Sequence, residues 1–150
     1  VVQDDDLLHN LDLTKILKLN KEHNSSVIVT HRMKSEEIAK RFGVVTINTK
    51  NIAIKLQEKP NLEEINTNNG AALANGGTYI LTKKEIENIR TYQKETIGNK
   101  NIPLDKTGEW FSWIIEKKGK ILTHEHPKEY WWDVGKKEEL NMAREFYQKL

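Results

Sequence analysis

Three adjacent carboxylates, Asp4, Asp5 and Asp6, follow two valines at the start of the chain. The valines predict the end of a buried strand. Carboxylates side by side repel one another, and an acid that is buried without a partner is costly. In open α/β sheets ligands bind beyond the carboxyl ends of strands, and Mg²⁺ typically takes one or two protein carboxylates. The stretch is therefore a candidate Mg²⁺ site, with a solvated turn as the alternative.

A further acid, Asp133, follows three aromatic residues in the stretch YWWDVG at residues 130–135. It can serve as a second metal ligand, or it can assist the N-cap of the last helix. The local sequence leaves both interpretations open.

The stretches EKP (58–60) and NGG (75–77) carry groups that could contact a ligand. Lys59 is a point charge for a phosphate, and Glu58 accepts hydrogen bonds from hydroxyl groups. The two glycines after Asn75 permit a ligand to approach the backbone closely. An exposed ion pair at a strand end and an ordinary turn are the respective alternatives.

Strands and helices that alternate along the chain must position these residues, which predicts an α/β domain spanning residues 1–150. Strands are expected at 25–31, 76–82 and 120–126, with a hairpin around residues 43–60. Helices are expected at 13–22 after a cap at Asp12, from 35 to a stop at Gly43, from 82 to about 92, around 110–114, and from about 136. Residues 61–73 and 93–105 are expected to be loops.

The composition is that of an ordinary globular protein of 150 residues. Its 24 basic and 22 acidic residues give a net charge of +2 and are scattered along the chain, which argues against a nucleic-acid partner. No cysteine is present, so disulfides and thiolate sites are excluded. The absence of cysteine fits a reducing cytoplasm, which is the location we expect. No apolar run is long enough to span a bilayer, so we expect no membrane partner. The chain has no initiator Met, and we expect it to be the later part of something longer.

The order of these motifs resembles the sugar-1-phosphate nucleotidyltransferases, which include glucose-1-phosphate thymidylyl- and uridylyltransferases and mannose-1-phosphate guanylyltransferases. The motifs are a strand with Asp, an LDL helix start, FGVV, EKP, NGGTYIL and YWWDVG. The family has Gly-Asp at its first metal site, so the resemblance implies that Asp6 is the ligand and that Asp5 stands where glycine is expected. This departure leaves Asp5 and Asp4 as rival ligands. Asp133 matches the second metal ligand.

The resemblance also implies roles for the residues between the two metal acids. Gly43, in FGVV, would approach the sugar, with Phe42 in place of the family's usual tyrosine. Glu58 and Lys59 match the residues that hold the sugar hydroxyls and the sugar phosphate. Asn75 and Gly77 match the start of the strand that closes over the sugar. Asp6, Lys59 and Asp133 would be the catalytic set, brought to neighbouring strand ends that face one cleft.

The implied fold is a Rossmann-like mixed sheet flanked by helices, and the implied partners are a nucleoside triphosphate, a hexose 1-phosphate and Mg²⁺. A homo-oligomer is also compatible with the family. The glycine-rich loop that holds the triphosphate in the family has no counterpart here, so we expect these 150 residues to carry the C-terminal, sugar-binding part of the catalytic domain and to be inactive alone. The alternative is a non-catalytic sugar-phosphate-binding or regulatory subunit.

Overall fold

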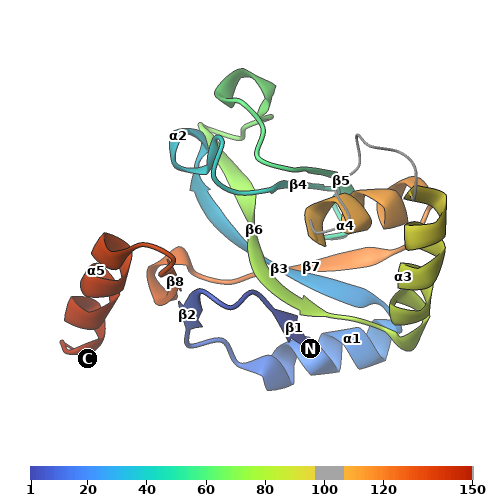
Figure 1. Ribbon diagram of the computed structural model, residues 1–150, viewed down its shortest axis with the longest axis horizontal. Coiled ribbons are helices and arrows are strands. Elements are labelled where there is room, and N and C mark those ends of the chain that lie inside the picture. Colours follow the sequence, from blue (N-terminus) through green and yellow to red (C-terminus); the bar gives the residue numbers. More distant parts are fainter. Residues whose placement is uncertain (97–106, 150) are drawn as a thin grey trace.

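The computed structural model describes residues 1–96 and 107–149 as a mixed β-sheet flanked by helices (Figure 1). The strands are β1 (Val2–Gln3), β2 (Leu7–His9), β3 (Ser26–Lys34), β4 (Val44–Ile47), β5 (Ala53–Gln57), β6 (Ala71–Ile80), β7 (Ile121–Glu125) and β8 (Trp131–Asp133). The α-helices are α1 (Leu13–His23), α2 (Ser35–Ile38), α3 (Lys83–Thr96), α4 (Thr107–Glu116) and α5 (Lys137–Tyr147), and the short 3₁₀ turns are Leu62–Glu64 and Lys128–Tyr130. The predicted α/β class is confirmed.

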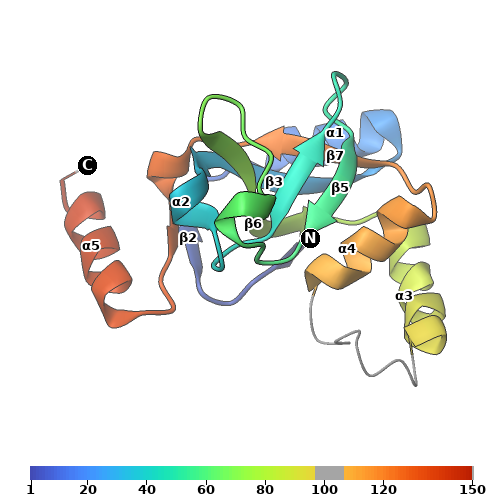
Figure 2. The same cartoon turned by 90° about the horizontal axis from the view of Figure 1, so that it is seen from above.

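Six strands form the main sheet in the order β5-β4-β6-β3-β7, with β1 added along β6. The pair β3–β7 is parallel, and the other ladders of this sheet are antiparallel. Strands β2 and β8 form a separate antiparallel pair. Figure 1 shows α5 beside β8, on the opposite side of the molecule from α3 and α4. In Figure 2, which is the view from above, α5 again stands at the far end from α3 and α4.

Both faces of the main sheet are covered by apolar side chains. Ile16 of α1 packs with Val27 and Val29 of β3 on one face. Phe111 and Ile114 of α4 belong to the cluster on the other face. Strand β3 is therefore buried over most of its length, as a central strand with helices on both sides must be.

Strand β6 changes neighbour in the middle of its length. Its residues Leu73 and Ala74 pair with β4, whereas Thr78 and Tyr79 pair with β1. Between these ladders the register with β3 shifts, because β6 carries extra residues there as a bulge. Gly77 lies in this bulge with a φ of +67°, a conformation that glycine adopts without steric cost. The NGG stretch is thus a break inside one continuous strand.

Several local predictions need correction. The opening valines do not end a buried strand: Val1 and Val2 are 63% and 47% exposed, because the short β1 lies along one edge of β6. The strand predicted at 76 begins five residues earlier at Ala71, and residues 61–73 include a 3₁₀ turn. Thr82 does cap α3, accepting a hydrogen bond from the Glu85 amide, but the helix runs beyond the predicted end at 92.

The boundaries of the first two helices can also be compared with the prediction. Asp12 caps α1 as predicted, with its side chain accepting from the Thr14 amide. Helix α2 ends well before the predicted stop at Gly43. The predicted loop at 93–105 falls mostly on residues outside the described part of the chain. Within residues 1–96 and 107–149, no helix is long and apolar enough to cross a membrane.

Candidate functional site

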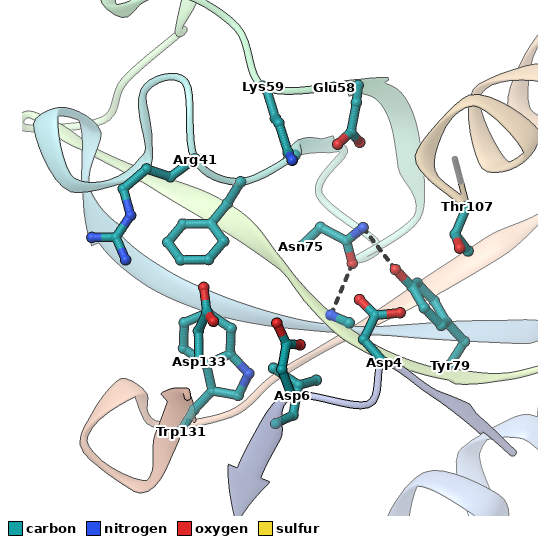
Figure 3. Close-up of a pocket in the computed structure, with 14 residues that line it drawn as sticks. Asp4, Asp6, Arg41, Glu58, Lys59, Asn75, Tyr79, Thr107, Trp131 and Asp133 are labelled. Carbon is teal, nitrogen blue, oxygen red and sulfur yellow. Dashed lines mark hydrogen bonds between the residues drawn. The ribbon is translucent and has the colours of Figure 1, made fainter. Parts of the chain in front are cut away.

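One cavity of about 310 Å³ gathers the residues that the sequence singled out (Figure 3). It lies where β6 changes neighbour, and its walls come from segments far apart in the chain. The predicted site residues that line it are Asp6, Gly43, Glu58, Lys59, Asn75, Gly77 and Asp133. Asp4, Leu7, Arg41, Phe42, Tyr79, Thr107 and Trp131 complete the lining.

The two proposed metal acids meet because β2 and β8 pair in antiparallel register. Leu7 lies opposite Asp133, and the Val134 amide donates a 2.8 Å hydrogen bond to the carbonyl of Asp6. A Cβ atom added to Gly135 would lie 2.9 Å from Asp6 Oδ2 and 3.4 Å from Asp133 Oδ1. The two carboxylates therefore converge on one point, at which Gly135 leaves room.

Asp133 does not cap the last helix. The N-cap position of α5 is Lys136, which makes no side-chain capping hydrogen bond. The Asp133 carboxylate instead accepts a 3.3 Å hydrogen bond from the Gly135 amide and faces the cavity. The N-cap interpretation is therefore wrong.

The two rival acids occupy different places. Asp5 is exposed and does not line the cavity, whereas Asp4 does. Asp4 precedes a turn formed by Asp5 and Asp6, and Figure 3 shows the Asp4 and Asp6 side chains turned to the same side of the chain. The Asp4 carboxylate lies against Gly77, where an added Cβ would come within 2.6 Å of its Oδ2. Burial raises the pKa of Asp4, and repulsion from Asp6, Asp5 and Glu58 raises it further.

Asn75 sits at the centre of the cavity in Figure 3 and is fixed by hydrogen bonds. Its amide nitrogen Nδ2 donates to Tyr79 Oη at 2.9 Å, and its Oδ1 accepts from the Gly77 amide at 3.3 Å. Its backbone amide donates to the carbonyl of Gly43 at 2.8 Å. Burial, and then the charge of Asp4, raise the pKa of Tyr79, so the phenol stays neutral and can donate its own proton to a ligand or acceptor.

Lys59 and Glu58 enter from the opposite rim, where β5 ends. Lys59 has a φ of +43°, which is unusual for a residue with a side chain, and Figure 3 shows its ammonium group turned toward the cavity. The Glu58 carboxylate lies close to Gly43, where an added Cβ would be 3.2 Å from Oε2, and against Gly108 near the start of α4. The Glu58 carboxylate therefore approaches the backbone closely at Gly43 and at Gly108, where a side chain would be in the way.

The charges of the cavity are unbalanced. Four carboxylates line it, those of Asp4, Asp6, Glu58 and Asp133, against the two cations Arg41 and Lys59. Arg41 forms an ion pair with Glu139 of α5, outside the lining. Such an acidic cavity suits a ligand that brings cations, and Asp6 and Asp133 are the pair that could share one. Within the described residues, no group of three or more His, Cys, Asp or Glu side chains is placed to hold a metal ion.

Sequence reasoning missed several lining residues. Tyr79 is two and four positions after Gly77 and Asn75, and strand periodicity could have placed it on the same face. Asp4 was named from the sequence only as a rival metal ligand, and the turn at Asp5 and Asp6 leaves no strand periodicity that would place its side chain. Trp131 stood out only as part of the aromatic run before Asp133, and Arg41 and Thr107 carried no signal of their own.

Comparisons with known proteins identify the family and the fold. The model of the nucleotidyl transferase family matches residues 1–149. Glucose-1-phosphate adenylyltransferases from Mycoplasma mobile and Clostridioides difficile are 28% and 30% identical over 136 and 133 residues, which is 87% of this chain in each case. These matches cover 32% and 31% of those two enzymes, so the chain spans about a third of their length.

A solved structure described as a glucose-1-phosphate thymidylyltransferase from Bacillus anthracis, in complex with sucrose, shares the fold. Its TM-score is 0.70 at 18% identity, covering 97% of this chain and 52% of that one. The predicted Rossmann-like fold with a mixed sheet is thereby confirmed. Because the family model covers almost the whole chain, this protein belongs to the nucleotidyl transferase family.

Proposed function

We propose that the protein containing this chain is a sugar-1-phosphate nucleotidyltransferase, which joins a nucleoside monophosphate from a nucleoside triphosphate to a hexose 1-phosphate. The observation that carries the proposal is the convergence of Asp6, Asp133 and Lys59 on one cavity. Membership of the nucleotidyl transferase family and the names of the glucose-1-phosphate relatives support the same reaction class.

Asp6 and Asp133 are the residues that would hold Mg²⁺. The donor set fits, because two carboxylates suit an ion that typically takes one or two of them and fills its shell with water and phosphate oxygens. The space that Gly135 leaves beside both carboxylates supports this assignment. When bound, Mg²⁺ supplies charge neutralisation for two substrates that both carry phosphates.

The chain's other residues bind and orient the sugar phosphate. The Lys59 ammonium group offsets the charge of the sugar phosphate, while Glu58 and Asn75 hydrogen-bond sugar hydroxyls. Gly43 and Gly77 allow the sugar to approach the backbone. An oxygen of the sugar phosphate then attacks the α-phosphorus of the triphosphate in line, a new P–O bond forms, and pyrophosphate leaves with the electron pair of the broken bond. Positioning and charge neutralisation are sufficient for this step, and no side-chain nucleophile is needed.

The test is pyrophosphate release by the full-length protein, with ATP, GTP, CTP, UTP and dTTP each offered with glucose 1-phosphate or mannose 1-phosphate and Mg²⁺. At least one pair should release pyrophosphate and yield the nucleotide sugar in equal amounts. Calorimetric binding of a hexose 1-phosphate without turnover of any pair would instead support the non-catalytic subunit. Neither binding nor turnover would contradict both.

A further inference from the structure

The two halves of the cavity belong to different sheets. Asp133 lies in β8 and Asp6 directly precedes its partner strand β2, whereas Asn75 and Gly77 lie in β6 of the main sheet. On the side of Asp6 a backbone hydrogen bond joins the halves, from the Asp4 amide to the carbonyl of Gly77 at 2.9 Å. On the side of Asp133 the link is a side chain, because the Trp131 indole Nε1–H donates to the carbonyl of Gly76 at 3.1 Å.

The indole of Trp131 is fixed from two directions. Trp131 is only 6% exposed and is stacked on the imidazole of His31, with centroids 4.6 Å apart and planes at 23°. Phe42 meets the indole edge-on at 5.2 Å. A ring packed in this way has few alternative rotamers, so its N–H group stays directed at the carbonyl of Gly76.

His31 is itself set in place by its neighbours. Its Nδ1 lies 2.9 Å from the carbonyl of His126, which can only accept, so Nδ1 carries the proton and Nε2 does not. A Cβ added to Gly76 would lie 2.6 Å from that Nε2. Only glycine at position 76 lets the imidazole pack against β6, which explains the first glycine of the NGG stretch.

We propose that Trp131 is a positioning residue, whose indole N–H fixes the distance between the metal acid Asp133 and the sugar-binding segment at Gly77. Trp131 is two residues before Asp133, and Gly76 is adjacent to Gly77. One hydrogen bond between them therefore sets the relation of two proposed ligand sites, which no backbone ladder among the described residues connects on this side. The inference rests on the proposed function of the cavity.

This role predicts a specific division of effects. Without the indole hydrogen bond each half keeps its own side chains and binds its own ligand. What changes is the alignment of the sugar phosphate with the metal-bound triphosphate, and misplacement of reacting groups lowers the rate of the chemical step. A positioning defect therefore lowers kcat more than it changes KM.

The chain offers a matched control in Trp132. It is the next residue on β8, its Nε1 is buried with no hydrogen-bond partner among the described residues, and it lines a neighbouring cavity instead of this one. Trp131→Phe and Trp132→Phe thus remove the same atoms from the same strand. Only the first removes a hydrogen bond.

In the full-length protein, Trp131→Phe should lower kcat about tenfold while changing KM for the hexose 1-phosphate and the half-saturating Mg²⁺ concentration by less than about threefold. Trp132→Phe should leave kcat and both of these constants within about twofold of the wild-type values. An unchanged kcat in Trp131→Phe would overturn the proposal, and so would a raised KM at unchanged kcat, which would mark Trp131 as a substrate contact.

A second variant separates the hydrogen bond from ring volume. Replacing Trp131 by β-(3-benzothienyl)alanine keeps the bicyclic shape and the stacking on His31 but puts sulfur in place of N–H. It should reproduce the loss of kcat seen with Trp131→Phe. A wild-type kcat in this variant would assign the effect to packing and would overturn the role of the N–H group.

Amide hydrogen exchange tests the link even if no nucleotidyl transfer is found. The reporters are the Val134 amide, which binds the carbonyl of Asp6, and the Asp4 amide, which binds the carbonyl of Gly77. Loss of one neutral hydrogen bond should accelerate their exchange about three- to tenfold in both Trp131 variants and not in Trp132→Phe. Absence of pyrophosphate release in the wild type would refute the proposed function alone, whereas unchanged exchange in the Trp131 variants would refute the link.

Discussion

The two sheets that build the cavity are held together in different ways. The main sheet has a central strand buried on both faces, and its residues belong to apolar clusters with α1 and α4. The β2–β8 pair is only three residues long on each strand, and apart from Trp131 its side chains are partly or fully exposed. From this difference we expect stability and the proposed chemistry to be separated: the main sheet carries the buried core, whereas β8 and the turn before β2 present Asp133 and Asp6 to the cavity.

Neutralising an acid of the small pair should have the largest effect on activity and little on the fold. Asp133→Asn in the full-length protein should lower Mg²⁺-dependent pyrophosphate release roughly hundred- to thousandfold, because charge neutralisation at the transferred phosphate is lost. The melting temperature should stay close to that of the wild type, since Asp133 is partly exposed and its side chain does not cap α5. Asp5→Asn is the matched control and should retain activity, because Asp5 does not line the cavity. Pyrophosphate release near the wild-type rate in Asp133→Asn would make Asp133 a structural residue.

A core substitution in the main sheet should show the opposite pattern. Ile28 of β3 is fully buried in the cluster with α4. Ile28→Ala should lower the free energy of unfolding by about 2–5 kcal/mol in denaturant titrations. Its Mg²⁺ affinity, measured by calorimetry well below the unfolding midpoint, should remain that of the wild type. A large loss of Mg²⁺ affinity in the folded variant would show that the two regions are not separable.

Acid should weaken the junction between the two regions through His31. Burial is the main cause that lowers the pKa of His31 from 6.5 to about 4, with smaller contributions from His126, His9 and His124. Between these values the unfolded chain binds a proton that the folded chain does not, so the free energy of unfolding falls as the pH drops from about 6.5 to 4. The loss from this group is roughly 3 kcal/mol.

His31→Phe keeps an aromatic ring beside Trp131 and removes this titration. Burial also lowers the pKa values of His9, His124 and His126, so some pH dependence will remain in the variant. Denaturant titrations at pH 7 and pH 4.5 give the change in the free energy of unfolding between these pH values. This change should be larger in the wild type than in His31→Phe. Equal pH dependence in the two proteins would mean that His31 titrates normally.

The smallest expected effects separate the charge and hydroxyl contacts of the sugar half. Lys59→Ala should lower the affinity for every hexose 1-phosphate by a similar factor of roughly ten to a hundred, because a charge-assisted hydrogen bond contributes about 1.5–3 kcal/mol. Glu58→Ala should instead change the ranking among hexoses, since hydroxyl positions differ between them. Calorimetry on the full-length protein measures both. The assignments are reversed if Lys59→Ala alters the sugar preference while Glu58→Ala weakens all sugars equally.

The two sheets also differ in how much of each could be predicted from the sequence. The α/β class and the helix start at Asp12 come from local periodicity and capping, which act within a few residues. The convergence of Asp6 and Asp133 could be expected only from the order of motifs, because pairing between β2 and β8 joins residues more than 120 positions apart. The prediction of a buried strand end at Val1 and Val2 was wrong, because apolar composition does not distinguish a central strand from the edge position that β1 occupies.

The bulge in β6 and the link through Trp131 were beyond sequence reasoning. The glycines of the NGG stretch are equally compatible with a turn, and only the ladders with β4, β1 and β3 show a continuous strand. A tryptophan in an aromatic run is usually a core residue, and the indole N–H acquires a role only when the carbonyl of Gly76 lies opposite. Such features depend on tertiary register, which a single sequence does not specify.

The central claim is that a metal site on the small pair and a sugar-phosphate site on the main sheet face one another in a single cavity. A crystal of the full-length protein grown with Mn²⁺ and glucose 1-phosphate, measured with anomalous scattering, tests this most directly. The account predicts an anomalous peak bound by the carboxylates of Asp6 and Asp133, with the sugar phosphate against the Lys59 ammonium group in the same cavity. A peak on Asp4 or Asp5 without Asp133, or glucose 1-phosphate bound away from Lys59, would contradict it.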